Sequence, residues 1–200
     1  MVRLRQWFWR ASFSERYRVG GEGFVSKDLE EVRTFVVEGK GEAKFFGEVG
    51  SLGKASFRIA NSRARAFALS LALKQPRNIT NRAVIDTASA LSHFNKKQFH
   101  HIYPKAYLKN IGDPNDHNSI LNVCLLAASE NNTVSDTDPH DYLPKYIFEL
   151  SEKSEAVFTS NVLPSPKNFD YKTSSYTSFL KERELLLASY WTVLCEGNFH

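Results

Sequence analysis

Apolar positions in the first half of the chain recur every three or four residues, which is the spacing of one face of a helix. This pattern predicts helices over residues 28–37, Ser62–Lys74 and Ala83–Phe94. Ser26 is a suitable N-cap for the first of them, and Pro76 ends the second. The glycines at positions 20, 21 and 23 predict a loop before the first helix.

The pattern changes in the middle of the chain, where short apolar or β-branched runs are separated by turn residues. Phe99–Tyr103 and Ile120–Leu126 are predicted strands, and a turn-rich stretch at 110–118 joins them. Ala127–Val134 can begin a helix after the second strand. The predicted order is therefore strand, loop, strand, helix.

The last third of the chain is predicted to be helical around one loop. Pro139 suits the first turn of a helix that runs from Asp138 to Leu150. Residues 159–173 are a predicted loop, and Tyr176–Cys195 is a predicted closing helix. The fold class expected from these elements is mainly α with a small β-hairpin.

The segment at 2–18 interleaves five arginines with five aromatic residues. This mixture suits contact with a nucleic-acid strand, in which cations meet phosphate and rings stack on bases. It equally suits a helix whose aromatic stripe packs into a core, and we favour that interpretation. A third possibility is a structural helix that joins this chain to a further domain. The residues concerned are Arg3, Arg5, Arg10, Arg16 and Arg18, with Trp7, Phe8, Trp9, Phe13 and Tyr17.

Composition places the chain among ordinary globular proteins, with 24% charged and 42% hydrophobic residues in a length of 200. These values exclude a disordered chain, a collagen-like repeat and a disulfide scaffold. The formal net charge of +4 is unevenly distributed. Residues 1–82 hold 16 Lys/Arg and 8 Asp/Glu, a net charge of +8, whereas residues 83–200 hold 10 and 14, a net charge of −4. The basic half either faces a polyanion, docks against another domain or is only a solvated surface.

The cysteine pattern favours a reducing compartment. Cys124 and Cys195 lie far apart in apolar surroundings, and the absence of any CxxC pair excludes a four-cysteine zinc site. The arginine-broken N-terminal segment does not resemble a signal peptide, and the apolar run at Phe67–Leu73 is too short to span a bilayer. We therefore expect a cytoplasmic protein.

Two adjacent histidines on the first predicted strand are the most informative residues for chemistry. Asn122 follows His101 by twenty-one residues, and Asn131 follows nine residues later. Hydrolysis of a phosphodiester needs a base for water, which imidazole supplies near neutral pH, and a divalent cation to neutralise phosphate charge. Neighbours on a strand point to opposite faces, so His100 and His101 are expected to do different work.

This region resembles the HNH, or ββα-metal, nuclease motif. More narrowly, residues 99–109 and 118–126 resemble the C-terminal nuclease domain of the GmrSD-type family, which acts in modification-dependent restriction and antiphage defence. The resemblance extends to Asp141–Pro144, to the segment that begins at Phe179, and to the Trp-Phe-Trp-Arg run at 7–10. It implies an HNH core at 95–150, preceded by a basic helical region at 1–94. A loop and a C-terminal helix at 151–200 would pack on that core.

The resemblance also implies a role for each polar residue of the motif. His101 would activate the attacking water, and His100 and Asn131 would ligate a divalent metal, Mg²⁺ or alternatively Mn²⁺. Asn122 would brace the hairpin and orient His101, and Asn118 would have a supporting, structural role. The four lysines expected to attract the DNA backbone are Lys96, Lys97, Lys105 and Lys109.

The function implied by the resemblance is that of a metal-dependent DNA endonuclease domain. Its expected partners are DNA and an N-terminal sensor or nucleotide-hydrolysing domain of the same protein, because this chain contains no phosphate-binding glycine motif. We therefore expect the chain to be the C-terminal part of a longer protein. The alternative is a DNA-binding or partner-docking module with a degenerate or autoinhibited HNH fold.

Overall fold

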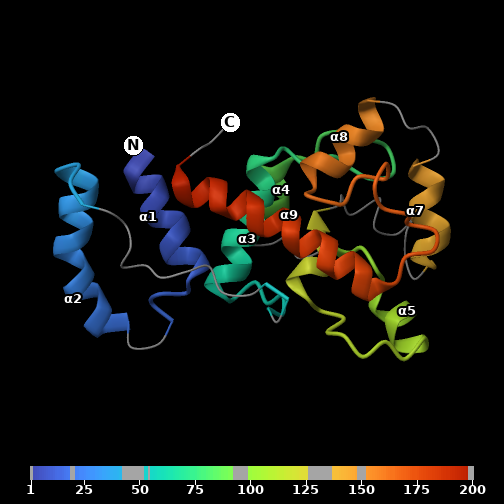
Figure 1. Cartoon of the computed structure of the whole chain (residues 1–200), viewed down its shortest axis with the longest axis horizontal. Helices are drawn as coiled ribbons and strands as arrows, with labels where there is room; N and C mark the ends of the chain where they lie inside the picture. The colour runs from blue at the N-terminus through green and yellow to red at the C-terminus, as the bar shows by residue number, and fades with distance from the viewer. Residues whose placement is uncertain are drawn as a thin grey trace. The chain divides into compact units, whose positions relative to one another are not determined.

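The chain is mainly helical and contains a small two-stranded antiparallel sheet (Figure 1). The computed structural model describes residues 2–18, 21–41, 52–53, 55–91, 99–125, 137–147 and 152–197. The described helices and strands, in chain order, are α1 (Val2–Phe13), α2 (Gly21–Val32), the π-helix η1 (Arg33–Val37), α3 (Ser62–Leu73), α4 (Thr87–Leu91), β1 (Phe99–His101), α5 (Lys105–Asn110), the 3₁₀ turn η4 (Ile120–Asn122), β2 (Val123–Leu125), α7 (Pro139–Ile147), α8 (Glu152–Ser160) and α9 (Tyr176–Glu196).

Two compact units make up the fold. Unit 1 contains residues 1–51, 58–66 and 187–200, and unit 2 contains residues 52–57 and 67–186. The units cut across the three regions drawn from the sequence, since α3 and α9 each contribute residues to both.

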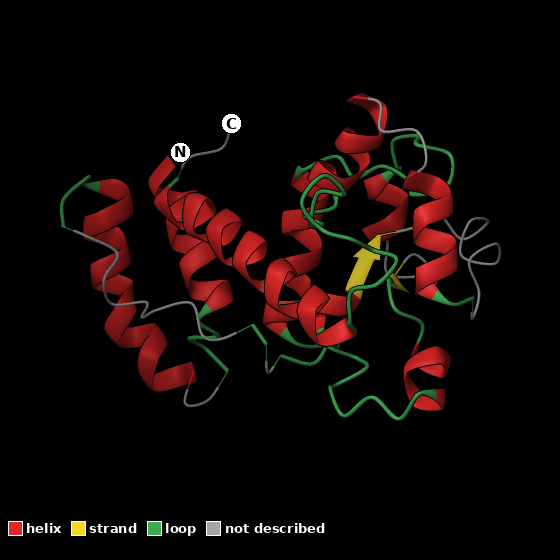
Figure 2. Cartoon of the chain, turned by 45° about the vertical axis from the view of Figure 1, so that its right-hand side comes forward, coloured by secondary structure: helices red, strands yellow, loops and turns green. Residues whose placement is uncertain are grey.

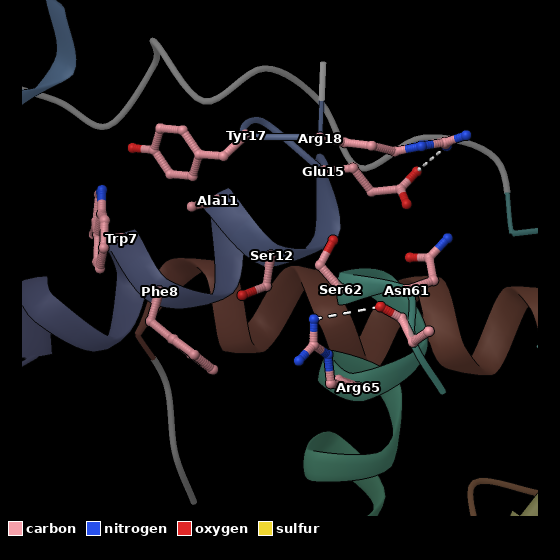
Figure 3. A pocket seen from close by; sticks show the side chains of 11 residues that line it. Trp7, Phe8, Ala11, Ser12, Glu15, Tyr17, Arg18, Asn61, Ser62 and Arg65 are labelled. Carbon is pink, nitrogen blue, oxygen red and sulfur yellow. Dashed lines mark hydrogen bonds and ion pairs between the residues drawn. The ribbon is translucent and has the colours of Figure 1, made fainter. Parts of the chain in front are cut away.

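Aromatic packing organises unit 1. The ring of Phe13, at the end of α1, stacks on the ring of Trp191 with centroids 3.7 Å apart, and both side chains are fully buried. Trp9 is 5% exposed and stacks on Phe13 in turn. Segment 2–18 therefore begins as a helix whose aromatic residues pack into a core, as the favoured interpretation predicted. A pocket of about 520 Å³ opens beside α1 (Figure 3).

A bidentate ion pair ties α2 to the end of α1 within unit 1. Arg16 Nε and Nη2 donate to the two carboxylate oxygens of Asp28 at 2.5 and 2.6 Å. The Asp28 side chain is 1% exposed, so its charge is compensated in a buried position. The guanidinium of Arg16 also lies 4.7 Å from the centre of the Phe24 ring.

This ion pair accounts for an error in the predicted start of the helix at 28–37. The helix begins at Gly21, so Ser26 lies inside it and is not an N-cap, and the predicted loop at 21–23 is helical. The Asp28 carboxylate binds Arg16 and does not lie in the first turn of a helix. Contact of the Phe24 ring with Arg16 favours the additional helical residues before Asp28. Gly39 and Gly41 follow the helical segment with φ of 70° and 73°, which suits glycine.

The core of unit 2 surrounds the hairpin, which Figure 2 shows among helices. β1 and β2 pair antiparallel, with Phe99 opposite Leu125 and His101 opposite Val123. Buried apolar residues from the hairpin, α5, α7, α8 and α9 form one cluster. Its most buried members include Ile102, Tyr103, Leu108, Cys124, Leu143 and Phe179.

A buried arginine links several elements of unit 2. Arg183, in α9, is fully buried and donates to the carbonyls of Leu121 at 2.6 Å, Val162 at 3.2 Å and Asn161 at 3.3 Å. Burial lowers the pKa of Arg183 to about 10, so the guanidinium remains charged at neutral pH. Val162 has a φ of 52°, which is strained for a β-branched residue. The bond from Arg183 helps to hold that strained turn.

Several other elements differ from the prediction in extent. The helix predicted from Ala83 begins only at Thr87. Val84 forms an isolated antiparallel β-bridge with Arg77, and the Asp86 carboxylate caps the helix by accepting from the amides of Ala88 and Ser89. Residues 120–122 form a 3₁₀ turn, so the second strand begins only at Val123. The sequence analysis did not predict α5 or α8. The predicted segments 127–134, 92–94 and 148–150 lie outside the described residues.

The long helices agree more closely with the sequence pattern. α9 and α3 differ from the predicted Tyr176–Cys195 and Ser62–Lys74 by one residue at their C-terminal ends, and α7 begins at Pro139. Within the described part of the chain, none of these helices combines the length and apolar character that crossing a membrane requires.

Replacing Arg183 by leucine is expected to destabilise the protein by about 3 kcal/mol, because three buried carbonyls would lose their donor. Urea unfolding measures this change. Lys181, exposed on the same helix, provides the control, and Lys181→Leu should change the unfolding free energy by no more than about 0.5 kcal/mol. Equal stability of the two variants would contradict the role given to Arg183.

The two thiols are expected to be unreactive in the folded protein. Burial raises the pKa of Cys124 to about 12 and that of Cys195 to about 11. Labelling with Ellman's reagent at pH 8 should be at least about a hundredfold slower in buffer than in urea, because thiolate is the reactive form. Rapid labelling of both thiols in the native protein would show that they are accessible and ionised.

Candidate functional site

The two adjacent histidines lie on β1 in different surroundings. His100 pairs across the hairpin with Cys124 and is 5% exposed, whereas His101 pairs with Val123 and is half-buried. Successive strand residues point to opposite faces, which accounts for this difference. The structure thus gives the two imidazoles separate environments, as the strand pattern predicted.

Asn122 closes the end of the hairpin through its side chain. Its Oδ1 accepts from the backbone N–H of Tyr103 at 2.8 Å, and its Nδ2 donates to the carbonyls of Tyr103 at 2.9 Å and His117 at 3.1 Å. The residue is fully buried, and its own carbonyl accepts from the N–H of Ile102. Asn122 therefore continues the pairing one step beyond the strands, and in this sense it braces the hairpin.

The contact to the His101 ring comes from Asn118, a task that the resemblance had given to Asn122. Asn118 Oδ1 lies 3.0 Å from His101 Nε2. Asn118 Nδ2 donates to the carbonyl of Phe57 at 2.6 Å, which leaves Oδ1 as the acceptor facing the ring. His101 Nε2 therefore carries the hydrogen in the neutral ring, and Nδ1 carries the lone pair.

His101 is held in its neutral form. Burial lowers its pKa to about 4, and the charges of Lys105 and His100 act in the same direction, against the opposing effects of Asn118 and Asp116. An unprotonated imidazole with a defined tautomer is the form that can take a proton.

The loop that carries Asn118 is fixed by backbone and side-chain bonds. Asp116 accepts from the amide of Asn118 at 2.8 Å through one carboxylate oxygen and from the hydroxyl of Ser56 through the other. Residues 55–57 run antiparallel to 118–120, with Phe57 N–H donating to the Asn118 carbonyl at 2.7 Å. The support for the His101 ring thus comes partly from the Phe57 segment, which lies sixty-one residues before Asn118 in sequence.

The proposed DNA-contacting lysines are only partly described. Lys105 and Lys109 are exposed on α5, and a separation of four residues places them on the same side of that helix. Lys96 and Lys97 lie outside the described residues, as does the predicted metal ligand Asn131. Within the described ranges, no group of three or more His, Cys, Asp or Glu residues is arranged to hold a metal ion.

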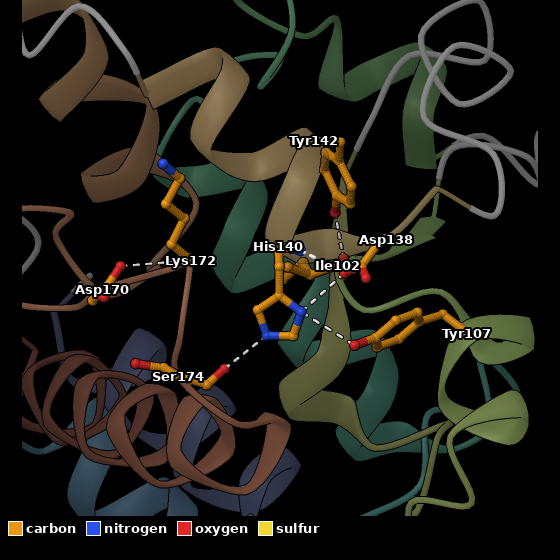
Figure 4. A network of polar contacts seen from close by, with 8 residues as sticks. All are labelled: Ile102, Tyr107, Asp138, His140, Tyr142, Asp170, Lys172 and Ser174. Carbon is orange, nitrogen blue, oxygen red and sulfur yellow. Dashed lines mark hydrogen bonds and ion pairs between the residues drawn. The ribbon is translucent and has the colours of Figure 1, made fainter.

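A polar network fixes α5 relative to α7 (Figure 4). His140 Nε2 lies 3.1 Å from the carbonyl of Ser174, and its Nδ1 lies 2.9 Å from Asp138 Oδ1 and 3.1 Å from the hydroxyl of Tyr107. Asp138 also accepts from the N–H of His140, which makes it the N-cap of α7. Tyr142, four residues after Asp138, donates to the carbonyl of Ile102, which directly follows His100 and His101 in the sequence.

Sequence analysis missed Arg183, Phe57 and Ser56 as supports of this region. A signal existed only for Arg183, since it lies four residues from both Phe179 and Leu187 on the buried stripe of α9. Phe57 acts through its backbone carbonyl, which no residue pattern indicates.

No family model and no solved structure matches the chain. The chain is similar to an uncharacterized protein of Methanocaldococcus jannaschii, with 24% identity over 161 residues. The match covers 74% of this chain and 26% of that relative, so the chain spans about a quarter of the length of the relative that it matches.

Acid is expected to destabilise the protein through His101. Its pKa in the folded state, about 4, lies below the ordinary 6.5, so the unfolded chain binds the proton first as the pH falls. The contribution of neutral His101 to the free energy of unfolding is complete above pH 6.5 and is lost as the pH falls from 6.5 toward 4. Urea unfolding should show that the wild type loses about 1 to 2 kcal/mol more than His101→Gln between pH 6.5 and 4.5. Parallel losses in the two proteins would contradict the low pKa.

Proposed function

We propose that this chain is a metal-dependent DNA endonuclease domain of the HNH type, from a restriction or antiphage defence protein. The observation that supports this best is the state of His101. It lies on one strand of a braced hairpin, is neutral, and has its Nε2 hydrogen bonded to Asn118. The remaining ring nitrogen, Nδ1, therefore carries the lone pair that a general base requires.

In the proposed reaction, His101 Nδ1 takes a proton from a water molecule as the water oxygen attacks the phosphorus. A new bond forms between phosphorus and the water oxygen, and the bond to one ester oxygen breaks. That oxygen leaves with the bonding electrons and takes a proton from solvent. Asn118 keeps the imidazole in the required tautomer throughout, because its amide orientation is fixed by Phe57.

His100 and Asn131 would hold the divalent cation, Mg²⁺ or Mn²⁺. One imidazole nitrogen and one amide oxygen are donors that such ions accept, and two protein ligands leave positions for water and phosphate. When bound, the cation neutralises charge on the phosphate and on the leaving oxygen. His100 is adjacent to His101 on β1 but points to the opposite face of the strand, so this assignment depends on the resemblance.

Lysines next to the hairpin would attract the DNA backbone. Lys105 is exposed and contributes to the electrostatic environment of His101, and Lys109 lies one turn along α5. Lys96 and Lys97 precede β1 in sequence and would add to this attraction. The net charge of residues 83–200 is −4, so local cations must supply the phosphate contacts there.

The wider protein is part of the proposal. We infer a sensor or nucleotide-hydrolysing domain N-terminal to this chain, which would choose the DNA to be cut, and a cytoplasmic location. The extra length of the Methanocaldococcus jannaschii relative beyond the matched quarter is consistent with additional domains.

Plasmid nicking tests the proposed activity. The chain with Mg²⁺ or Mn²⁺ should convert supercoiled plasmid to the nicked form, and His101→Ala should slow this at least about a hundredfold, since a general base contributes that much. Asn118→Ala should slow it about tenfold, the usual effect of losing a residue that orients a functional side chain. His117→Ala is the matched control, because that ring bonds to the Asp113 carbonyl and not to His101.

Urea unfolding of each variant separates lost activity from lost structure. Nicking by folded His101→Ala at the wild-type rate would remove His101 as the base. DNA binding that weakens with salt, without cleavage in either metal, would favour the DNA-binding or docking module instead.

A further inference from the structure

The pocket beside α1 combines an aromatic wall with charged groups, and the proposed nuclease chemistry does not use it. It lies within unit 1 and has a volume of about 520 Å³, which is within the range of ligand sites. Figure 3 shows the rings at one end and most of the charged groups toward the other. The lining residues that matter here are Trp7, Phe8, Tyr17, Glu15, Arg18 and Arg65.

The aromatic wall is formed before any ligand arrives. Trp7 and Tyr17 are partly buried and pack against the small core of Ala11 and Phe35, which limits their freedom. Phe8 is 38% exposed at the same pocket. Flat rings that are already ordered favour stacking with a flat ligand, because little conformational freedom is lost on binding.

The charged end offers cations to an anion. Arg18 is 64% exposed and is held by Glu15, whose Oε2 accepts from Arg18 Nη1 at 3.2 Å and lies 3.5 Å from Arg63 Nη2. Arg65 is exposed, and its Nη2 donates to the Ala60 carbonyl at a long distance, 3.4 Å. Glu15 has a φ of 53°, a left-handed conformation that is uncommon for a non-glycine residue.

We propose that this pocket binds one unstacked nucleotide, with the base on the aromatic wall and the phosphate at Arg65 and Arg18. A purely apolar ligand would leave both arginines unused, and a simple anion would leave the rings unused. A nucleotide uses both kinds of group, since every base has a flat face for stacking and every nucleotide carries phosphate. The inference goes beyond the proposed cleavage, because binding here requires neither a metal nor His101.

The nucleotide can come from a strand or from solution. A base within a duplex is stacked and paired, so it enters such a pocket only after it is flipped out. Single-stranded DNA should therefore bind more tightly than duplex DNA of the same length. Tighter binding of the single strand would also agree with the nucleic-acid interpretation of the mixed arginine and aromatic pattern at 2–18. The segment would then bind nucleic acid while part of it forms the helix α1.

Fluorescence anisotropy with the full chain and a labelled deoxyadenosine strand, in EDTA so that no metal contributes, tests the proposal. Phe8→Ala should weaken strand binding about tenfold, the usual effect of losing one stacking ring. Arg65→Ala should weaken it about threefold and reduce the slope of log affinity against log salt by about 0.7, as expected for one lost phosphate contact. Leu4→Ala and Arg58→Ala are matched controls on exposed side chains of unit 1 outside the pocket, and each should change affinity less than about twofold.

Competition by AMP identifies the source of the nucleotide. Displacement of the strand by AMP would assign the pocket to free nucleotides as well, and strand binding that AMP does not displace would assign it to nucleotides within a strand. Three results would overturn the proposal: pocket variants that bind the strand like their controls, pocket variants that lose as much affinity for duplex as for the single strand, or no binding of strand or AMP. Thermal unfolding confirms that each variant is folded.

Discussion

The hydrogen bonds of the buried Arg183 guanidinium are the interaction on which the described structure of unit 2 most depends. A charged side chain at a fully buried position is unfavourable unless its hydrogen-bonding groups are satisfied, and here three backbone carbonyls satisfy it. Those carbonyls belong to the 3₁₀ turn before β2 and to the turn that follows α8, two segments far apart in the sequence. The Arg183 side chain therefore holds these segments together, as backbone hydrogen bonds between strands would do in a larger sheet.

The consequences extend from this side chain to the candidate site. Arg183 bonds to the Leu121 carbonyl, and the next residue is Asn122. The Asn122 amide bonds to the backbone of Tyr103, which lies two residues beyond the end of β1. His101 is the last residue of that strand. A hairpin with three residues in each strand is marginal by itself, so these side-chain bonds account for much of its order.

The sequence was a good guide where a feature depends on a long local pattern. The helices α9 and α3 were predicted almost to the residue, because a periodic apolar face identifies them. The start of α2 was missed, because the contacts of Arg16 with Asp28 and Phe24 are tertiary and give no local pattern in the sequence. In the site, the resemblance implied that Asn122 braces the hairpin, whereas the partner of the His101 ring depends on the Phe57 carbonyl, which orients Asn118 and leaves no mark in the sequence.

The path of the chain between the two units limits how the protein can be divided. Four crossings separate the residues of unit 1 from those of unit 2, and two of them fall inside the continuous helices α3 and α9. The same helix thus carries Arg183 for one core and Trp191 for the other. Truncation at either of these helices would leave each fragment with a severed helix and an incomplete core. Neither unit can therefore be excised as a contiguous stretch of chain with its helices intact.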